Sequence, residues 1–161
     1  MIIAFDLDGV LREGHLGLFK LCTTDPTPQK IEALEIETMA SCKPLLNPML
    51  FATKDDVIYC ISNCGSEWSL KQKREWLYHF YGKRITFEPV QVAKGLWKKA
   101  YCDATAKAKI DLMIKLGVEV YFDDDPAIIN AMRNLVKTEE YKDLAGHIKF
   151  IKYGTWVEEY Y

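Results

Sequence analysis

Residues 1–14, MIIAFDLDGVLREG, place two aspartates directly after a run of apolar residues. The run over residues 1–5 has no polar face, which predicts a strand buried on both sides of a sheet. Because side chains alternate along an extended chain, Asp6 and Asp8 point the same way, and converging like charges raise each other's pKa unless a cation or a proton lies between them. A strand that ends in an Asp8-Gly9 turn explains the same residues. The segment alone leaves two interpretations open, a charged site and a plain turn.

The 161 residues have the composition of a globular protein, with 49% hydrophobic and 27% charged residues. This length predicts one domain with one core. The formal net charge of −2 favours neither nucleic acid nor a membrane surface as a partner. The five cysteines show no CxxC spacing, so we expect reduced thiols. The chain lacks a basic leader and any run of about 18 apolar residues, so we expect a cytoplasmic protein without a membrane partner.

Apolar strands and helical patterns alternate along the chain. We predict further strands over residues 57–61, 84–88, 118–122 and 148–151. We predict helices over residues 27–42, 45–52, 69–81, 106–116, 126–135 and 139–145. In the helix over 69–81, Ser69 is the expected N-cap, and Lys71 and Lys73 are expected to face water. This alternation predicts an α/β fold, a Rossmann-like three-layer sandwich with a central, mostly parallel five-stranded sheet.

Small polar and acidic residues follow three of the predicted strands, namely Asp6, Asp8, Ser62, Asp123 and Asp124. The carboxyl ends of parallel strands share one edge of the sheet, where ligands bind, so we expect these side chains in one crevice. Several carboxylates in one cleft need a hard cation, and Mg²⁺ is the natural choice for oxygen ligands and for phosphoryl transfer. Ser62 and Asn63 offer hydroxyl and backbone hydrogens to a phosphoryl oxygen.

These residues resemble the four motifs of the haloacid dehalogenase-like (HAD) superfamily of phosphatases, in order and over nearly the whole chain. The first motif is the strand followed by Asp6-Leu7-Asp8-Gly9, the second is the strand that ends at Ser62, and the fourth is the strand that ends in Asp123-Asp124. The third is a single lysine in the helix before the fourth motif. Lys109 is the preferred candidate, and Lys107 is the alternative.

The resemblance implies a two-step phosphatase reaction. Asp6 is implied to attack phosphorus, to form an aspartyl-phosphate and to bind the metal. Asp8 is implied to protonate the leaving oxygen and then to deprotonate the attacking water, while its backbone carbonyl reaches the metal.

The resemblance also implies roles for the other motif residues. Ser62 and Lys109 would bind the phosphoryl group, with Asn63 beside them. Asp123 would bind Mg²⁺ directly, and Asp124 would hold a metal-bound water or orient Lys109.

The chain is expected to form one HAD-like domain over residues 1–161, with a small cap or flap insertion at about 12–43. The short insertion implies a fairly open cleft, so we expect a nucleotide, a nucleic-acid end or another phosphorylated molecule as substrate. Several lysines with two aromatic residues among them lie close together in the sequence, and two interpretations stay open. They bind along a polyanion such as nucleic acid, or they form a solvated helix face. The members of this group are Lys94, Trp97, Lys98, Lys99, Tyr101, Lys107 and Lys109. The competing hypothesis is a catalytically silent domain of this fold that binds a phosphorylated partner.

Overall fold

The computed structural model describes residues 1–13, 42–92 and 98–154, together with residues 27, 29–30, 32–33 and 36–37. Most of the flap predicted at about 12–43 therefore lies outside the described residues. Two members of the lysine group, Lys94 and Trp97, also lie outside them. Within the flap, residues 29–30, 32–33 and 36–37 are helical, in line with the helix predicted there.

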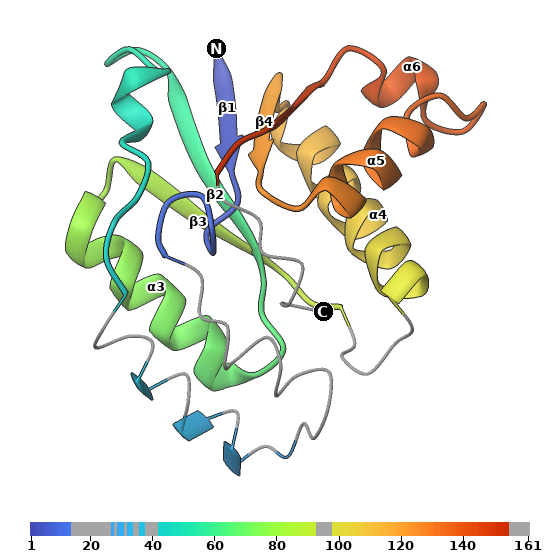
Figure 1. Cartoon of the computed structure of the whole chain (residues 1–161). Helices are drawn as coiled ribbons and strands as arrows, with labels where there is room; N and C mark the ends of the chain where they lie inside the picture. Colours follow the sequence, from blue (N-terminus) through green and yellow to red (C-terminus); the bar gives the residue numbers. More distant parts are fainter. Residues whose placement is uncertain are drawn as a thin grey trace.

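Five parallel strands form one sheet in the order β3-β2-β1-β4-β5 (Figure 1). The strands are β1 (Ile2–Phe5), β2 (Val57–Asn63), β3 (Ile85–Val90), β4 (Val120–Asp123) and β5 (Lys149–Lys152). This arrangement confirms the predicted α/β sheet, which is parallel throughout. In the register, Phe5 lies opposite Cys60 of β2 and Phe122 of β4. The residues that follow Phe5, Cys60 and Phe122 therefore emerge at the same edge of the sheet.

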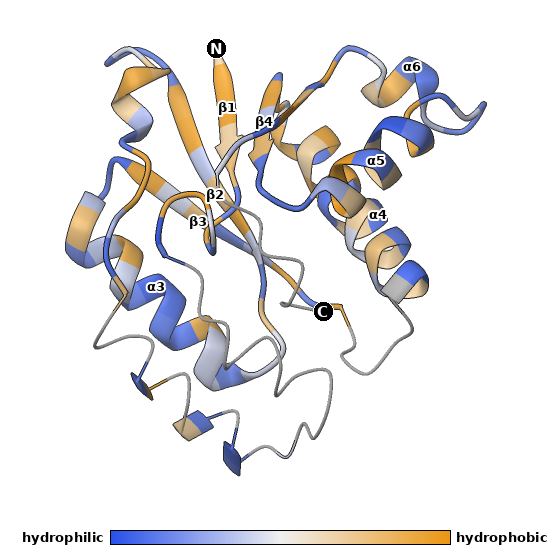
Figure 2. Cartoon of the chain, viewed as in Figure 1, coloured by the Kyte–Doolittle hydropathy of each residue, from blue (hydrophilic) through white to orange (hydrophobic). Residues whose placement is uncertain are grey.

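Helices cover both faces of the sheet (Figure 1). Helix α3 (Glu67–Tyr81) packs on one face, and α4 (Lys98–Leu116) and α5 (Pro126–Leu135) pack on the other, with α6 (Lys142–Ala145) at the end of this second layer. Central strand β1 divides its side chains between two cores. Ile3 and Phe5 belong to the α3-side core, and Ala4 belongs to the α4-side core. Strands β1 and β4 are largely apolar and buried, whereas only Phe150 of edge strand β5 is buried (Figure 2).

Several element bounds differ from the sequence prediction. The segment predicted as a helix over residues 45–52 contains only the 3-10 turn η1 (Pro48–Leu50), which Asn47 caps by accepting from the Met49 N–H at 3.0 Å. Helix α3 begins at Glu67 because the Ser66 hydroxyl accepts from the Ser69 N–H at 3.0 Å, so Ser69 is not the N-cap. Helix α4 begins well before residue 106. Among the described helices, none combines the length and apolar character needed to cross a lipid bilayer.

Truncation of Leu77 tests the α3-side core. Leu77 is 1% exposed, so Leu77→Ala should lower the free energy of unfolding by about 2 to 5 kcal/mol through lost burial and a residual cavity. The matched change Leu144→Ala, at a residue 55% exposed, should alter it by less than about 0.5 kcal/mol. Urea denaturation of the two variants measures the difference, and equal losses would contradict this placement of the core.

Candidate active site

The loop after β1 places two carboxylates at the edge of the sheet. The Asp6 N–H donates to the Phe122 carbonyl at 2.8 Å, which holds the end of β1 against β4. The N–H groups of Leu11 and Arg12 both donate to the Leu7 carbonyl, so the chain turns tightly after Leu7. The turn brings Arg12 back beside Asp8.

Three carboxylates from β1 and β4 converge in the described structure. Asp6, Asp123 and Asp124 each offer one oxygen, and these oxygens lie within 4.8 Å of one another. Burial, together with Asp123 and Asp8, raises the pKa of Asp6 to about 7 against the lowering effect of Lys109. Burial and the neighbouring carboxylates raise the pKa of Asp124 to about 9. Full ionisation of the cluster is therefore unfavourable in these surroundings without a further positive charge.

This donor set fits a hard divalent cation. All three ligands are carboxylates, which suit Mg²⁺, and their spacing allows one ion to reach all of them. The raised pKa values of Asp6 and Asp124 show that a positive charge at this point would be stabilised.

Lys109 lies against this cluster. Its ammonium donates to Asp6 Oδ1 at 3.0 Å and to Asp123 Oδ2 at 3.3 Å, and the side chain is buried. Burial by itself would lower the pKa of Lys109, but Asp6 and Asp123 outweigh it and hold that pKa well above its ordinary value. Lys107, the alternative motif lysine, instead donates to Asp111 at 2.8 Å and to the Tyr141 hydroxyl at 2.9 Å. Of the two lysines, Lys109 is the one that contacts the three-carboxylate cluster.

Tyr121 completes the Lys109 contacts and was not anticipated from the sequence. Its buried hydroxyl accepts from Lys109 at 2.7 Å and donates to Asp123 Oδ2 at 2.6 Å. The signal was available in the strand pattern, because residues 121 and 123 point to the same side of an extended chain.

Asp8 stands apart from the three-carboxylate cluster. Arg12 Nε donates to Asp8 Oδ1 at 2.5 Å, and Lys73 Nζ lies 3.4 Å from Asp8 Oδ2. Burial would raise the pKa of Asp8, but Arg12 and Lys73 outweigh it and lower that pKa to about 2. The Asp8 side chain is therefore ionised and held by two cations.

Arg12 links this ion pair to α3. It is fully buried and donates through Nη1 to Gln72 Oε1 at 2.8 Å. The sequence offered one signal for the Arg12–Asp8 pair, namely that Arg12 stands four residues after Asp8.

Ser62 and Lys73 meet at the end of β2. Lys73 Nζ donates to Ser62 Oγ at 3.0 Å and to the Asn63 carbonyl at 2.6 Å. The expectation that Lys73 faces water was wrong, because the residue is only 6% exposed. Lys73 lies one helical turn before the buried residues Trp76 and Leu77, so it shares their face of α3.

The Asn63 side chain is engaged within the fold. Its Nδ2 donates to the Tyr101 hydroxyl at 3.1 Å, and its Oδ1 accepts from the Val92 N–H at 2.9 Å. These bonds tie β2 to α4 and to the chain after β3.

The lysines that were grouped by sequence have different surroundings. Lys99 pairs with Asp103 at 2.8 Å and Lys107 pairs with Asp111 at 2.8 Å, both on the exposed side of α4. Lys109 is buried in the site and does not belong to a surface.

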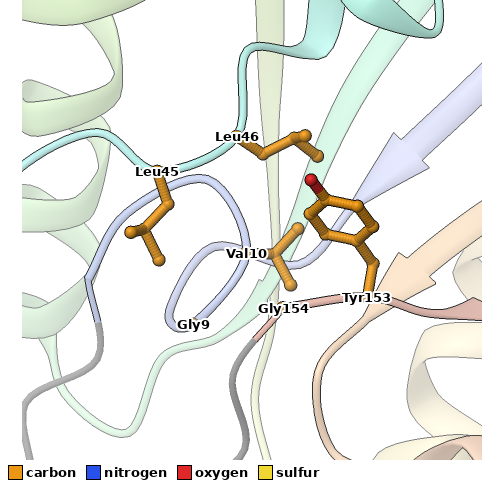
Figure 3. A pocket seen from close by; sticks show the side chains of 6 residues that line it. All are labelled: Gly9, Val10, Leu45, Leu46, Tyr153 and Gly154. Atoms are coloured by element: carbon orange, nitrogen blue, oxygen red, sulfur yellow. The ribbon is translucent and has the colours of Figure 1, made fainter.

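A cavity of about 260 Å³ lies beside the loop after β1. Val10, Leu45, Leu46 and Tyr153 surround it with Gly9 and Gly154 (Figure 3). Gly9 touches both regions, because it packs against the Asp124 carboxylate. An apolar recess thus adjoins the acidic cluster.

Comparison with known proteins supports the fold. No protein-family model matches the chain, and no curated protein matches it in sequence. Among solved structures, the chain is similar to the HAD domain of the effector protein Lem4 from Legionella pneumophila, solved as an inactive mutant. The two are 18% identical with a TM-score of 0.51, over 98% of this chain and 88% of that one. The chain therefore has a HAD-like fold, with its acidic cluster at the carboxyl ends of β1 and β4.

Substitution of Gly9 tests how closely the loop packs on the cluster. Gly9 has a φ of +82°, and a Cβ there would overlap the Asp124 carboxylate, whereas a Cβ at Gly82, with a φ of +56°, meets nothing within 4 Å. Gly82→Ala, at a φ of 56° and a ψ of −134°, should cost about 1 to 3 kcal/mol of unfolding free energy from backbone strain alone. Gly9→Ala should cost about 1 to 3 kcal/mol more because of the overlap. Chemical denaturation measures both, and a Gly9→Ala cost no larger than that of Gly82→Ala would contradict the packing.

Proposed function

We propose that this chain is a Mg²⁺-dependent phosphomonoesterase that acts through an aspartyl-phosphate on Asp6. The observation that carries the proposal is the meeting of Asp6, Asp123 and Asp124 with Lys109 at the carboxyl ends of two neighbouring parallel strands. The HAD-like fold and the order of the motifs support it.

In this proposal, Asp6 attacks phosphorus and the leaving oxygen departs on the opposite side. The Lys109 ammonium, 3.0 Å from Asp6 Oδ1, neutralises charge that develops on the phosphoryl oxygens. Tyr121 and Asp123 hold Lys109 in place through hydrogen bonds of 2.7 and 3.3 Å. The Ser62 hydroxyl, at the end of β2, donates to a phosphoryl oxygen.

Asp6, Asp123 and Asp124 would hold the metal. Mg²⁺ supplies, when bound, a positive charge that stabilises the phosphoryl oxygens in the transition state. The Asp124 carboxylate packs against Gly9, and this contact would hold it toward the carboxylates of Asp6 and Asp123.

Asp8 would serve as the acid and base of the two steps, as a proton donor to the leaving oxygen and a proton acceptor from water.

The proposed substrate is a nucleotide, a nucleic-acid end or another phosphorylated molecule. The four described cysteines, Cys42, Cys60, Cys64 and Cys102, are buried and form no disulfide with one another, which supports a cytoplasmic location.

A second candidate is a catalytically silent domain that binds a phosphorylated partner. One observation favours it. Arg12 and Lys73 both contact the Asp8 carboxylate, an arrangement that opposes the protonated form needed by a general acid. The two candidates differ in turnover, so one assay separates them.

Hydrolysis of p-nitrophenyl phosphate with and without Mg²⁺ tests the phosphatase. The intact protein should turn over only with the metal, and Asp6→Asn should lose at least about a hundredfold in rate because the nucleophile is gone at nearly constant shape. Calorimetric titration of Mg²⁺ follows binding separately. Mg²⁺ binding without turnover of this substrate or of a panel of nucleotides and phosphorylated oligonucleotides would favour the silent domain.

Two lysine variants identify the motif lysine. Lys109→Met should lower kcat/KM for p-nitrophenyl phosphate by about 100- to 1,000-fold, because an ammonium beside the reacting carboxylate is removed. Lys107→Met, two residues away on the same helix, removes an exposed pair with Asp111 and should leave kcat/KM within about twofold. The reverse ranking would assign the role to Lys107.

A further inference from the structure

We infer that Lys73 is a positioning residue that turns the Ser62 hydroxyl into a hydrogen-bond donor aimed at an anionic phosphoryl group. The inference rests on the proposed function, since it adds a residue to the same phosphoryl-binding site. Lys73 lies on α3, outside the four motifs, and the inference comes from the contacts of its side chain.

The chemistry of the two groups sets the direction of their hydrogen bond. An ammonium group carries hydrogens and no acceptor, so in the 3.0 Å contact Lys73 Nζ donates and Ser62 Oγ accepts. The hydroxyl hydrogen of Ser62 must then point elsewhere. Among the described residues, the Ser62 hydroxyl donates no hydrogen bond to an acceptor. Ser62 is 2% exposed, so this donor is held ready for a bound acceptor.

Charge neutralisation of Asp8 does not by itself explain Lys73. Arg12 already pairs with Asp8 at 2.5 Å, whereas Lys73 Nζ lies 3.4 Å from the other Asp8 oxygen. The shorter contacts of Lys73 are with Ser62 Oγ and the Asn63 carbonyl, at 3.0 and 2.6 Å. Both acceptors stand at the carboxyl end of β2. A buried ammonium is costly, so its placement at this strand end has a local purpose.

The two buried lysines approach the site from opposite faces of the sheet. Lys109 comes from α4 and contacts Asp6, whereas Lys73 comes from α3 and contacts Asp8 (Figure 1). A phosphoryl group between the ends of β1 and β2 would thus meet positive charge from both layers. The Ser62 hydroxyl lies on the Lys73 side.

Binding of inorganic phosphate to the Mg²⁺-loaded protein, followed by calorimetry, tests the inference without requiring turnover. The variants are Lys73→Met, Ser62→Ala and the double variant, with Lys71→Met as control because Lys71 lies on the same helix and is exposed. Each single change in the Lys73–Ser62 pair should weaken phosphate binding about 10- to 100-fold. The double variant should be no weaker than the weaker single variant, because both changes remove one hydrogen-bonded unit. Lys71→Met should bind as the intact protein does.

Lys73→Gln guards against a folding failure of Lys73→Met. Glutamine keeps an N–H donor for Ser62 Oγ without the charge, so it should recover part of the lost affinity. Circular dichroism and thermal unfolding identify the folded variants. If only Lys73→Gln folds, the same cycle is run with it.

The outcomes separate this inference from the proposed function. Phosphate binding that is unchanged in the Lys73 variants, or effects of Lys73 and Ser62 that multiply in the double variant, would overturn it while leaving the phosphatase intact. Lys73-dependent phosphate binding without hydrolysis of any ester would support it and overturn the phosphatase. No phosphate binding by the intact protein would overturn both.

Discussion

Mutual repulsion between the buried carboxylates of Asp6, Asp123 and Asp124 is the constraint on which the rest of the structure depends. The register of β1 and β4 forces Asp6 and Asp123 to emerge side by side, and Gly9 allows Asp124 to pack against the loop. Such a group of charges is unstable alone in a buried place. Lys109, the Tyr121 hydroxyl and the Asp125 N–H offset part of the repulsion through hydrogen bonds.

The carboxylates at the strand ends outnumber the cations beside them. Four carboxylates, Asp6, Asp8, Asp123 and Asp124, face three cations, Arg12, Lys73 and Lys109. The two cations that contact Asp8 satisfy it, so the excess negative charge falls on the other three carboxylates. The helices on the two faces of the sheet therefore serve different halves of the site. The α3 side stabilises Asp8 and the end of β2, and the α4 side supplies one cation, Lys109, to the three remaining carboxylates.

The sheet and the acidic residues could be predicted from the sequence because both leave local patterns. Strands buried on both faces are continuous apolar runs, and the aspartates follow those runs directly. The resemblance made Lys109 the preferred motif lysine with Lys107 as the alternative, and of these two Lys109 is the one that contacts Asp6 and Asp123. Lys73 was missed because its contacts join α3 to the ends of β1 and β2, and a lysine among other charged helix residues gives no local sign of burial. Arg12 and Tyr121 were missed although each stands close in sequence to the aspartate that it contacts. The bounds of α3 and η1 were predicted wrongly because a helix begins where a single capping hydrogen bond forms, and the sequence offers several residues able to form it.

The central position of β1 also determines when the site can exist. The first strand of the chain pairs with β2 and with β4, and the Ile2 N–H donates to the Glu119 carboxylate 117 residues later. During synthesis, β1 and β2 can pair early, but the other edge of β1 waits for most of the chain. Asp6 likewise meets Lys109 across 103 residues. The carboxylates of Asp6 and Asp123 are therefore brought together only when β4 pairs with β1. Folding of this chain should be slow for its size, because its central contacts are among the most distant in sequence.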